Sequence, residues 1–438
     1  MSPPPLPTPG TDPGTDPPPE RADVVVVGAG IVGLATARAL QRAAPDLVVA
    51  VVEAEDRVAA HQSSHNSGVV HAGLYYRPGS TKAELCRSGR AELLDWCDRH
   101  EVAWRRCGKV VVATSAPEQA GLDALAERAT ANGIEISRLG PAGLADLEPH
   151  AVGRAALHVP ATAVIDFSQV CAELAAGIER RGATVALDVE VGRIERRAGE
   201  LVVHTSQGPV VASRVANCAG LHSDRVAAAA GDRPGAAILA FRGEYHELVP
   251  WRRHLVRALI YPVPDPRFPF LGVHLTRGID GTVHAGPNAV LALARQGYRR
   301  RDLVAGDVAA LATDAATWRL ARRYWRTGGA EVARSLSRRA SARSLRRLVP
   351  EIEAADLVPS GSGVRAQAVA PDGTLVDDFA FAGDGGAPPT GPDGAQRGPS
   401  GATPGAGGRL VHVVNAPSPA ATASLAIGRA VAERLLAG

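Results

Sequence analysis

The sequence predicts an α/β fold in which a dinucleotide-binding domain built on a parallel sheet is interleaved with an α+β domain built on a mainly antiparallel sheet. Three observations lead to this prediction. The valines from Val24 to Val27 precede a glycine-rich turn, a helical stretch and a second apolar run. Residues 236–290 alternate polar and apolar positions between Pro and Gly turns, which is typical of antiparallel strands. With 438 residues, the chain is also too long for one small core.

The predicted elements begin with a βαβ unit. The β-branched run at 24–27 suits a strand that is buried on both faces of a parallel sheet. A helix over 31–42 and a second strand over 47–52 complete the unit. We expect further helices at 80–100, 118–132, 166–181, 300–350 and 421–436, and further strands at 184–189, 210–217 and 410–414.

The order of these elements divides the chain into interleaved parts. We assign residues 22–80, 155–230 and 355–438 to the dinucleotide-binding domain, and residues 81–154 and 231–354 to the second domain. The Pro-rich segment 1–21 is expected to be a disordered tail, because it cannot bury enough apolar surface to order itself. The Gly- and Pro-rich segment 383–408 is expected to be a flexible surface insertion between two strands.

Composition excludes several classes of protein. The net charge of +3 gives no support for a nucleic-acid surface. Five cysteines without CxxC spacing argue against a metal site or a disulfide framework and favour a reducing compartment. No signal peptide or membrane-spanning run is recognised, so we expect a cytoplasmic location, with peripheral contact at the cytoplasmic face of a membrane left open. Lys82 and Lys109 are the only lysines, which we interpret as a compositional habit of the source genome.

The strongest local motif is Gly28-Ala-Gly30-Ile-Val-Gly33, which follows the first strand and opens the first helix. Glycines there permit a tight turn and let backbone N–H groups and the helix N-terminus approach a pyrophosphate. Glu53 ends the second strand 20 residues after Gly33, where an acidic side chain accepts hydrogen bonds from ribose hydroxyls. These spacings predict a dinucleotide site that does not fit NADP, and the motif alone leaves FAD and NAD open.

The segment that runs from His61 to Ser80, HQSSHNSGVVHAGLYYRPGS, resembles the signature of the L-2-hydroxyglutarate oxidase/dehydrogenase family, within the D-amino-acid-oxidase-like FAD superfamily. Further matching blocks lie at 241–245, 260–264, 270–277, 286–291, 363–367 and 415–422. The resemblance spans about residues 22–436 and departs from the family at the tail and the 383–408 insertion. It implies a Rossmann-like FAD-binding domain interleaved with a substrate domain. It also implies oxidation of L-2-hydroxyglutarate to 2-oxoglutarate, with quinone or dioxygen as the electron acceptor.

The resemblance also implies contacts to the cofactor. Asn66, Ser67 and Gly68 are expected to wrap the flavin or its ribityl chain, although a surface turn would have the same composition. Val191 is expected near the adenine, with a core strand as an equal explanation. The remaining cofactor candidates are small or hydroxylated residues that follow buried strands: Ala219, Gly220, Ser418, Ala420, Ala421 and Thr422. The last four lead into a helix whose N-terminus would face the flavin N1–C2=O edge, with ordinary capping as the alternative.

The substrate residues are chosen from the chemistry of a 2-hydroxy dicarboxylate, which needs two cations and a proton acceptor. Arg365 matches the superfamily position that binds the α-carboxylate. Arg242 and Arg277 are the candidates for the distal carboxylate, and Tyr245 is a candidate hydrogen-bond donor. His71 and His274 are the leading proton acceptors, because imidazole titrates near neutral pH. His65 is a weaker candidate, and the sequence does not choose among the three histidines.

Two other functions stay open on the sequence alone. The first is a related FAD-dependent oxidase that acts on an amino acid, an imino acid, glycerol 3-phosphate or another 2-hydroxy acid. The second is a flavin-binding module that has lost turnover and acts through partners. An α-amino substrate that reduces the flavin where 2-hydroxyglutarate does not would favour the first alternative.

Overall fold

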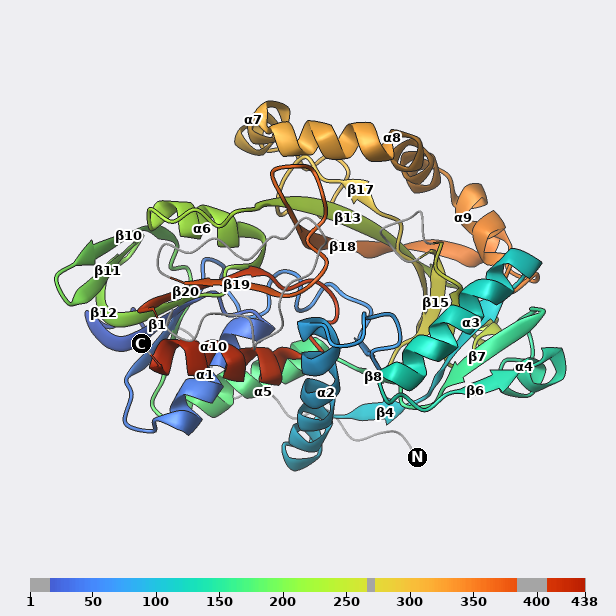
Figure 1. Cartoon of the computed structure of the whole chain (residues 1–438), viewed down its shortest axis with the longest axis horizontal. Helices are drawn as coiled ribbons and strands as arrows, with labels where there is room; N and C mark the ends of the chain where they lie inside the picture. The colour runs from blue at the N-terminus through green and yellow to red at the C-terminus, as the bar shows by residue number, and fades with distance from the viewer. Residues whose placement is uncertain (1–15, 266–271, 384–407, 438) are drawn as a thin grey trace.

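The computed structural model describes residues 16–265, 272–383 and 408–437 (Figure 1). Residues 1–15 of the predicted tail and 384–407 of the predicted insertion lie outside the described residues. The first strand begins at Arg21, which is the last residue of the predicted tail. The predicted α/β class is confirmed, because a mainly parallel sheet and a mainly antiparallel sheet form separate layers of the molecule.

The first sheet has eight strands, and its centre is parallel. Its strands are β1 (Arg21–Val27), β2 (Val49–Val52), β9 (Thr184–Ala186), β10 (Val191–Arg197), β11 (Glu200–Thr205), β12 (Gly208–Asn217), β19 (Ala380–Gly383) and β20 (Leu410–Asn415). The strands β9, β2, β1, β12 and β20 run parallel in that order. The hairpin β10–β11 and the pair β20–β19 both join β12, on the side of the sheet away from β9, and each adds antiparallel pairing there. The valine-rich β1 therefore occupies the buried middle of the sheet.

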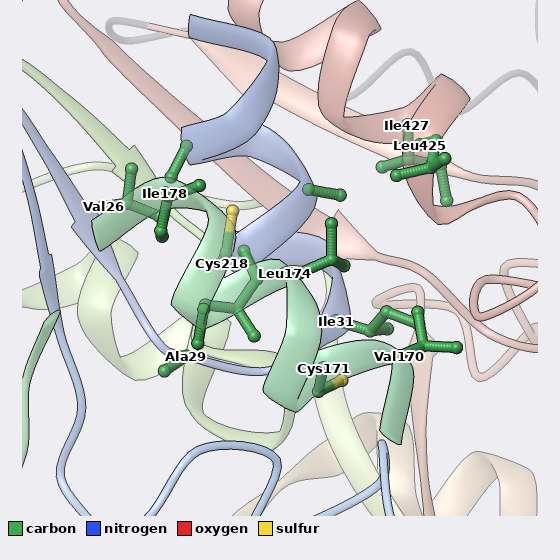
Figure 2. Close-up of a cluster of buried hydrophobic side chains, with 14 of the residues drawn as sticks. Val26, Ala29, Ile31, Val170, Cys171, Leu174, Ile178, Cys218, Leu425 and Ile427 are labelled. Atoms are coloured by element: carbon green, nitrogen blue, oxygen red, sulfur yellow. The ribbon is translucent and has the colours of Figure 1, made fainter. Parts of the chain in front are cut away.

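The two faces of β1 pack against different layers. Val24 and Val26 point toward α1 (Ile31–Ala43), α5 (Phe167–Glu179) and α10 (Ser424–Leu436), whose apolar side chains form one cluster with them (Figure 2). Val25 and Val27 point to the opposite face, where α6 (Ser223–Ala229) and the β10–β11 hairpin cover the sheet. An alternating, fully buried strand of this kind requires apolar residues at every position, which explains the run of valines.

Two close helix contacts fix the position of α10. A Cβ at Gly428 would lie 2.4 Å from the backbone carbon of Ala35 in α1. A Cβ at Gly89 in α2 (Thr81–Arg99) would lie 2.7 Å from the Cα of Ala423, directly before α10. Distances this short exclude a side chain unless the backbones move apart. The glycines therefore hold the start of α10 close to the first βαβ unit.

The second sheet has nine strands and is mainly antiparallel. Its strands are β5 (Lys109–Ala113), β6 (Ser137–Leu139), β7 (Ala155–Val159), β13 (Ala237–Leu248), β14 (Leu259–Pro262), β15 (His274–Arg277), β16 (Val283–Gly286), β17 (Val290–Leu291) and β18 (Leu357–Val369). The strands β13 and β18 pair along almost their whole length. The helices α3 (Ala116–Ala131), α4 (Pro141–Leu147), α7 (Ala305–Thr313), α8 (Ala315–Leu336) and α9 (Arg338–Leu345) surround this sheet (Figure 1). A small third sheet joins β3 (Val69–Val70), β8 (Ala163–Ile165) and β4 (Trp104–Arg106).

The predicted domain division differs from the observed sheets in three places. The strands β7 and β18 belong to the second sheet, although we assigned residues 155–230 and 355–438 to the dinucleotide-binding domain. Helix α2 packs in the core of the first domain, although residues 81–154 were assigned to the second. A strand or helix pattern does not reveal which sheet an element joins, because that depends on contacts between distant segments. The last helix also begins at Ser424 instead of 421.

Three further observations concern the cysteines, metal binding and membrane-spanning helices. The five cysteines are free, and four of them are buried. In the described part of the chain, no group of three or more His, Cys, Asp or Glu side chains is arranged to hold a metal ion. Among the helices that the structure describes, none has both the length and the apolar character needed to span a bilayer.

The glycine at the α1–α10 contact gives the first prediction. Replacing Gly428 with Ala should lower the free energy of unfolding by about 1–3 kcal/mol, since the added methyl group overpacks the contact. The matched control is Gly329→Ala in α8, where no described atom lies within 4 Å of the added Cβ. That change should raise stability by about 0.5–1 kcal/mol through helix propensity. Thermal and urea unfolding of both variants test this, and stabilisation by Gly428→Ala would contradict it.

Candidate active site

A cavity of about 690 Å³ lies where the carboxyl ends of the parallel strands meet the second sheet. Gly28, Glu53 and Val191 line one end, and His71 and Arg365 line the other. The strands β1, β2, β12 and β20 all end at its wall, which is the usual place for a ligand in an open α/β sheet. The volume is in the range of cofactor and ligand pockets. The cavity thus has a nucleotide end and a second end that we call the substrate end.

The glycine-rich turn forms the wall of the nucleotide end. Gly28 has φ +102°, and a Cβ there would lie 2.8 Å from the carbonyl oxygen of Cys218. A Cβ at Gly33 would lie 1.9 Å from the carbonyl oxygen of Gly28, so this glycine serves the packing of α1 and does not line the cavity. Gly30 precedes the first residue of α1, and the Ile31 N–H donates to Ser63 Oγ at 2.9 Å. The turn therefore leaves backbone, instead of side chains, exposed to a ligand.

Glu53 lies at the end of β2, as the motif predicts. Its Oε2 accepts a hydrogen bond from the Ala29 N–H at 2.6 Å, and its Oε1 accepts one from the Glu55 N–H at 3.1 Å. Burial raises the pKa of its carboxyl group. The side chain thus ties β2 to the glycine turn while lining the cavity beside Val191.

The segment 66–68 and the segment 219–220 lie along the middle of the cavity. Asn66 holds its own loop, because its Nδ2 donates to the Ser63 carbonyl at 2.7 Å and its Oδ1 accepts from the Gly68 N–H at 2.9 Å. Asn66 and Ser67 line the cavity, whereas Gly68, at φ +64°, only shapes the turn. Ala219 and Gly220, which follow β12, line the cavity as well. Small residues at these positions keep the passage open between the two ends.

The segment before α10 supplies backbone donors. Ser418, Ala420, Ala421 and Thr422 all line the cavity. Among the described residues, no hydrogen bond is made by the N–H groups of Ala421 and Thr422. Thr422 Oγ1 accepts from the His71 N–H at 3.1 Å, which joins this segment to the strand β3 region. The N–H groups at the start of a helix favour an anion or an electron-rich edge of a ring.

Arg365 and Tyr245 reach the substrate end from the strands β18 and β13. Arg365 pairs with Phe241 across the two antiparallel strands, so both side chains leave the same face of the sheet. Arg365, Phe241 and Tyr245 all line the cavity. Burial lowers the pKa of Arg365 from its usual value, while Tyr245 and Tyr76 oppose that effect. Burial raises the pKa of Tyr245, so its hydroxyl is a donor at neutral pH.

The two leading histidines also line the substrate end. Burial lowers the pKa of His71 to about 3, and Lys109, His274 and Arg365 lower it further by repulsion. Burial likewise lowers the pKa of His274 to about 4, with Lys109 and Arg365 adding to the shift. Both rings are therefore neutral at pH 7. His65 lines the cavity as well, but its Nδ1 is bonded to the His61 carbonyl and its ring packs on Tyr298.

Two of the predicted substrate residues lie away from the cavity. Arg242 does not line the cavity, and its guanidinium donates to the Arg299 carbonyl at 3.0 Å. Arg277 donates to the Arg253 and Val256 carbonyls at 3.0 and 3.1 Å, also away from the cavity. Successive side chains of a strand point to opposite faces of the sheet. Arg242 is three positions from the cavity-lining Tyr245, and Arg277 is three positions from the cavity-lining His274, so both arginines point away from the cavity.

Sequence reasoning missed Lys109, which lies behind the substrate end without lining the cavity itself. Its side chain is buried, and its Nζ lies 4.4 Å from the ring centroid of Tyr75 and 5.0 Å from that of Tyr261. It lowers the pKa of both His71 and His274, which places it beside the cavity wall. The signal was present in the sequence, because lysine is almost absent elsewhere.

The residues of this cavity fit FAD. The glycine turn accommodates a pyrophosphate that a Cβ would displace, and Glu53 lies where a ribose would bind. The N–H groups of Ala421 and Thr422 line the same cavity as Arg365 and would suit the electron-rich edge of a flavin ring. The carboxylates that line the cavity, Glu53, Glu55 and Glu190, belong to the nucleotide end, whereas the substrate end is built from cations, histidines and tyrosines.

Comparison with known proteins agrees with the fit of this cavity to FAD. The family model for the FAD dependent oxidoreductases (DAO) matches residues 23–434. The chain is 40% identical over 416 residues to the L-2-hydroxyglutarate dehydrogenase of Salmonella houtenae, covering 95% of this chain and 93% of that one. It is 41% identical to the enzyme of that name from Indibacter alkaliphilus (94% and 98% covered). It is 39% identical to the mitochondrial one from Homo sapiens (94% and 88% covered).

Solved structures share the fold at lower identity. The L-alpha-glycerophosphate oxidase of Mycoplasma pneumoniae, reduced and with FAD bound, superposes with a TM-score of 0.74 at 21% identity, covering 95% of both chains. The glycine oxidase of Geobacillus kaustophilus superposes with a TM-score of 0.68 at 19% identity, again covering 95% of both chains. These similarities concern the architecture, which is shared by enzymes with different substrates.

Proposed function

The chain belongs to the DAO family of FAD-dependent oxidoreductases, and on this premise we propose that it oxidises L-2-hydroxyglutarate to 2-oxoglutarate. The family expected from the sequence blocks is thereby confirmed, together with FAD as the cofactor. The substrate is proposed because relatives of that name are about 40% identical along nearly the whole chain. The observation that carries the proposal is the cationic substrate end, where Arg365 lies near His71, His274 and Lys109.

Each side chain of the substrate end has a role in this reaction. When bound, FAD accepts the hydrogen and the two electrons that leave the substrate carbon. Arg365 binds the α-carboxylate through two parallel N–H donors, which also orients the carbon that reacts. The Tyr245 hydroxyl donates a further hydrogen bond to the same carboxylate. Burial of these groups strengthens their interaction with an anion, because little water competes for them.

His274 is the better candidate for the proton acceptor. Its Nδ1 lies 2.9 Å from the Gly272 carbonyl oxygen, which only accepts hydrogen bonds, so Nδ1 carries the ring proton. The Nε2 atom therefore has a free lone pair for the hydroxyl proton of the substrate. The ring is fixed in place by stacking on Tyr261, with 4.0 Å between the centroids. His71, in contrast, has its Nε2 atom 3.4 Å from Ser418 Oγ and serves better as a hydrogen-bond partner of that segment.

The substrate end favours a hydroxy acid over an amino acid. An α-amino acid brings an ammonium group close to the guanidinium of Arg365, and no carboxylate of the described residues lines this end of the cavity to balance it. A second positive charge there would be repelled. Oxidation of glycerol 3-phosphate and flavin binding without turnover stay as rival functions. Turnover of L-2-hydroxyglutarate separates them from the proposal.

We further propose that α8 is the surface at which the protein meets an anionic membrane, with a quinone as electron acceptor. Trp318, Trp325 and Val332 of α8 are 58%, 66% and 49% exposed. A kink at Tyr324 separates Trp318 from the other two, and the spacing of seven residues places Trp325 and Val332 on one face of the second part of the helix. Three exposed arginines, Arg319, Arg322 and Arg323, lie between the two tryptophans in the sequence. Tryptophan and arginine on one exposed helix suit the interface of an anionic bilayer. Figure 1 shows α7 and α8 along an outer edge of the molecule, where such contact is unobstructed.

Substitution of Arg365 tests the substrate assignment. Turnover with a soluble dye as acceptor should produce 2-oxoglutarate from L-2-hydroxyglutarate and not from the D-enantiomer. Arg365→Ala should raise KM by about 10- to 100-fold through loss of a charged hydrogen-bond pair, while FAD stays bound. Arg365→Lys keeps the charge but not the two parallel donors, so its KM should lie between those of the unmodified protein and of Arg365→Ala. Unchanged kcat and KM in Arg365→Ala would remove this residue from the site.

Substitution of the two histidines tests the proton acceptor. His274→Gln should lower kcat by about 10²- to 10⁴-fold, since it removes the lone pair that takes the hydroxyl proton. His71→Gln is the matched control and should lower kcat much less, with FAD retained in both variants. A larger loss of kcat in His71→Gln than in His274→Gln would reverse the assignment.

Vesicle binding tests the membrane surface. The protein should co-sediment with vesicles that contain anionic phospholipid, and added salt should weaken the binding. The double variant Trp318→Ser/Trp325→Ser should lose this binding. Trp251→Ser is the matched control, because Trp251 is 72% exposed but lies outside α8. Equal binding of the double variant and the control variant, or no binding by the unmodified protein, would contradict the proposal.

A further inference from the structure

The two lysines of this chain are unusual in their position. Lysines and arginines together number 48, and all but Lys82 and Lys109 are arginine. Both lysines are buried, with 6% and 2% of their surface exposed. A compositional habit explains why arginine dominates the surface, but it does not explain why lysine is kept at two buried positions. Lysine at these positions must provide something that arginine cannot.

The two positions differ in their partners. Lys82 Nζ lies 3.1 Å from the carboxylate of Asp377, so its charge is paired. For Lys109, the described residues offer the rings of Tyr75 and Tyr261 and no ion pair. Two aromatic faces stabilise an ammonium group through their electron-rich centres, although less strongly than a carboxylate does. Among the described residues Lys109 therefore has no anionic partner, whereas Lys82 has one.

Lys109 does not line the cavity itself but lies behind its substrate end, with one side chain between. Its neighbour Tyr261 stacks on His274, which lines the cavity. Its charge acts on both His274 and His71. Arg365, the proposed partner of the α-carboxylate, acts on the same two histidines. Both cations thus act on one pair of cavity-lining rings, Arg365 from the cavity wall and Lys109 from behind it.

We propose that Lys109 takes up a proton when a dicarboxylate binds and supplies the positive charge that selects the second carboxylate. This inference rests on the proposed function, in which Arg365 binds the first carboxylate. It replaces Arg242 and Arg277 in the role that the sequence suggested for them. Lys109 is then the residue that distinguishes a dicarboxylic from a monocarboxylic hydroxy acid.

The chemistry of lysine suits this role. Burial lowers the pKa of Lys109 to about 7, so part of the population is neutral when no ligand is bound. A neutral amine avoids the large cost of an unpaired charge in a buried site, and a nearby carboxylate restores the ammonium form. Arginine stays charged at any physiological pH and is larger. A site that must be uncharged when empty and cationic when occupied therefore requires lysine.

The groups that face Lys109 titrate far from neutral pH. Burial raises the pKa of Tyr75 and Tyr261 above the usual tyrosine value and that of Cys86 to about 12. The pKa values of His71 and His274 are about 3 and 4. Between about pH 6 and pH 9, Lys109 is thus the group of this cluster that changes charge. Below the pKa of Lys109 the ammonium form is already present. Above that pKa, Lys109 must take up a proton each time a dicarboxylate binds. Dicarboxylate affinity therefore falls by up to about tenfold per pH unit above about pH 7.

Binding of unreactive ligands to the FAD-loaded protein tests this inference. Glutarate and pentanoate have equal chain lengths but two and one carboxylates, and neither has a hydroxyl group to oxidise. Titration calorimetry should show glutarate binding about tenfold more tightly or better at pH 6.5, with the advantage shrinking toward pH 9. Pentanoate, bound by Arg365, should show no such pH dependence over this range.

Variants at both lysines assign the effect to one residue. Lys109→Met should bind glutarate and pentanoate equally at every pH, whereas Lys82→Met, the same change at the paired lysine, should keep the preference and its pH dependence. Lys109→Arg should keep the preference and lose the pH dependence, which provides a second test if Lys109→Met does not hold FAD. The inference would be overturned if either Lys109 variant kept both the preference for glutarate and the pH profile of the unmodified protein. Glutarate selectivity without turnover of L-2-hydroxyglutarate would instead contradict the proposed function and leave the role of Lys109 supported.

Discussion

The contact between the turn at Gly28 and the end of β12 organises the rest of the molecule. The Cys218 N–H donates to the Val27 carbonyl at 2.9 Å, and the Cys218 carbonyl occupies the space that a Cβ at residue 28 would need. This contact brings the ends of the two central strands together and turns the chain into α1. Glu53, which accepts from the Ala29 N–H, ties the third strand end to the same turn. The nucleotide end of the cavity exists because these backbones lie so close together.

The second sheet contributes groups of a different kind. The first sheet presents mainly backbone and one acid, which suits a cofactor with phosphates and ribose. The strands β13, β15 and β18 present Tyr245, His274 and Arg365 from a single face, at the other end of the same cavity. Packing cations and neutral histidines together without an acid at that end costs stability until an anion binds. The protein keeps this cost small by lowering the pKa of Lys109 and the two histidines, so that few of them are charged when the site is empty.

Much of the cofactor end could be predicted from the sequence, because it depends on local patterns. The valine strand, the glycine turn and Glu53 follow from spacing within one βαβ unit. The substrate end depends on contacts between distant strands, and there the prediction was less accurate. Arg242 and Arg277 could have been excluded, since each has the wrong parity relative to Tyr245 or His274 in its own strand. Lys109 could not be placed without knowing that β5 pairs with β14 beside β15, a contact between segments about 150 residues apart. The domain assignment of β18 failed for the same reason.

The most direct test of the account is to mix the FAD-loaded protein with L-2-hydroxyglutarate in the absence of oxygen and to follow the visible absorbance of the flavin. The account predicts rapid bleaching, because electrons leave the substrate for the flavin before any acceptor is involved. The D-enantiomer should leave the absorbance unchanged. A flavin that stays oxidised with L-2-hydroxyglutarate but bleaches with an amino acid or with glycerol 3-phosphate would contradict the proposed substrate and the roles of Arg365 and Lys109.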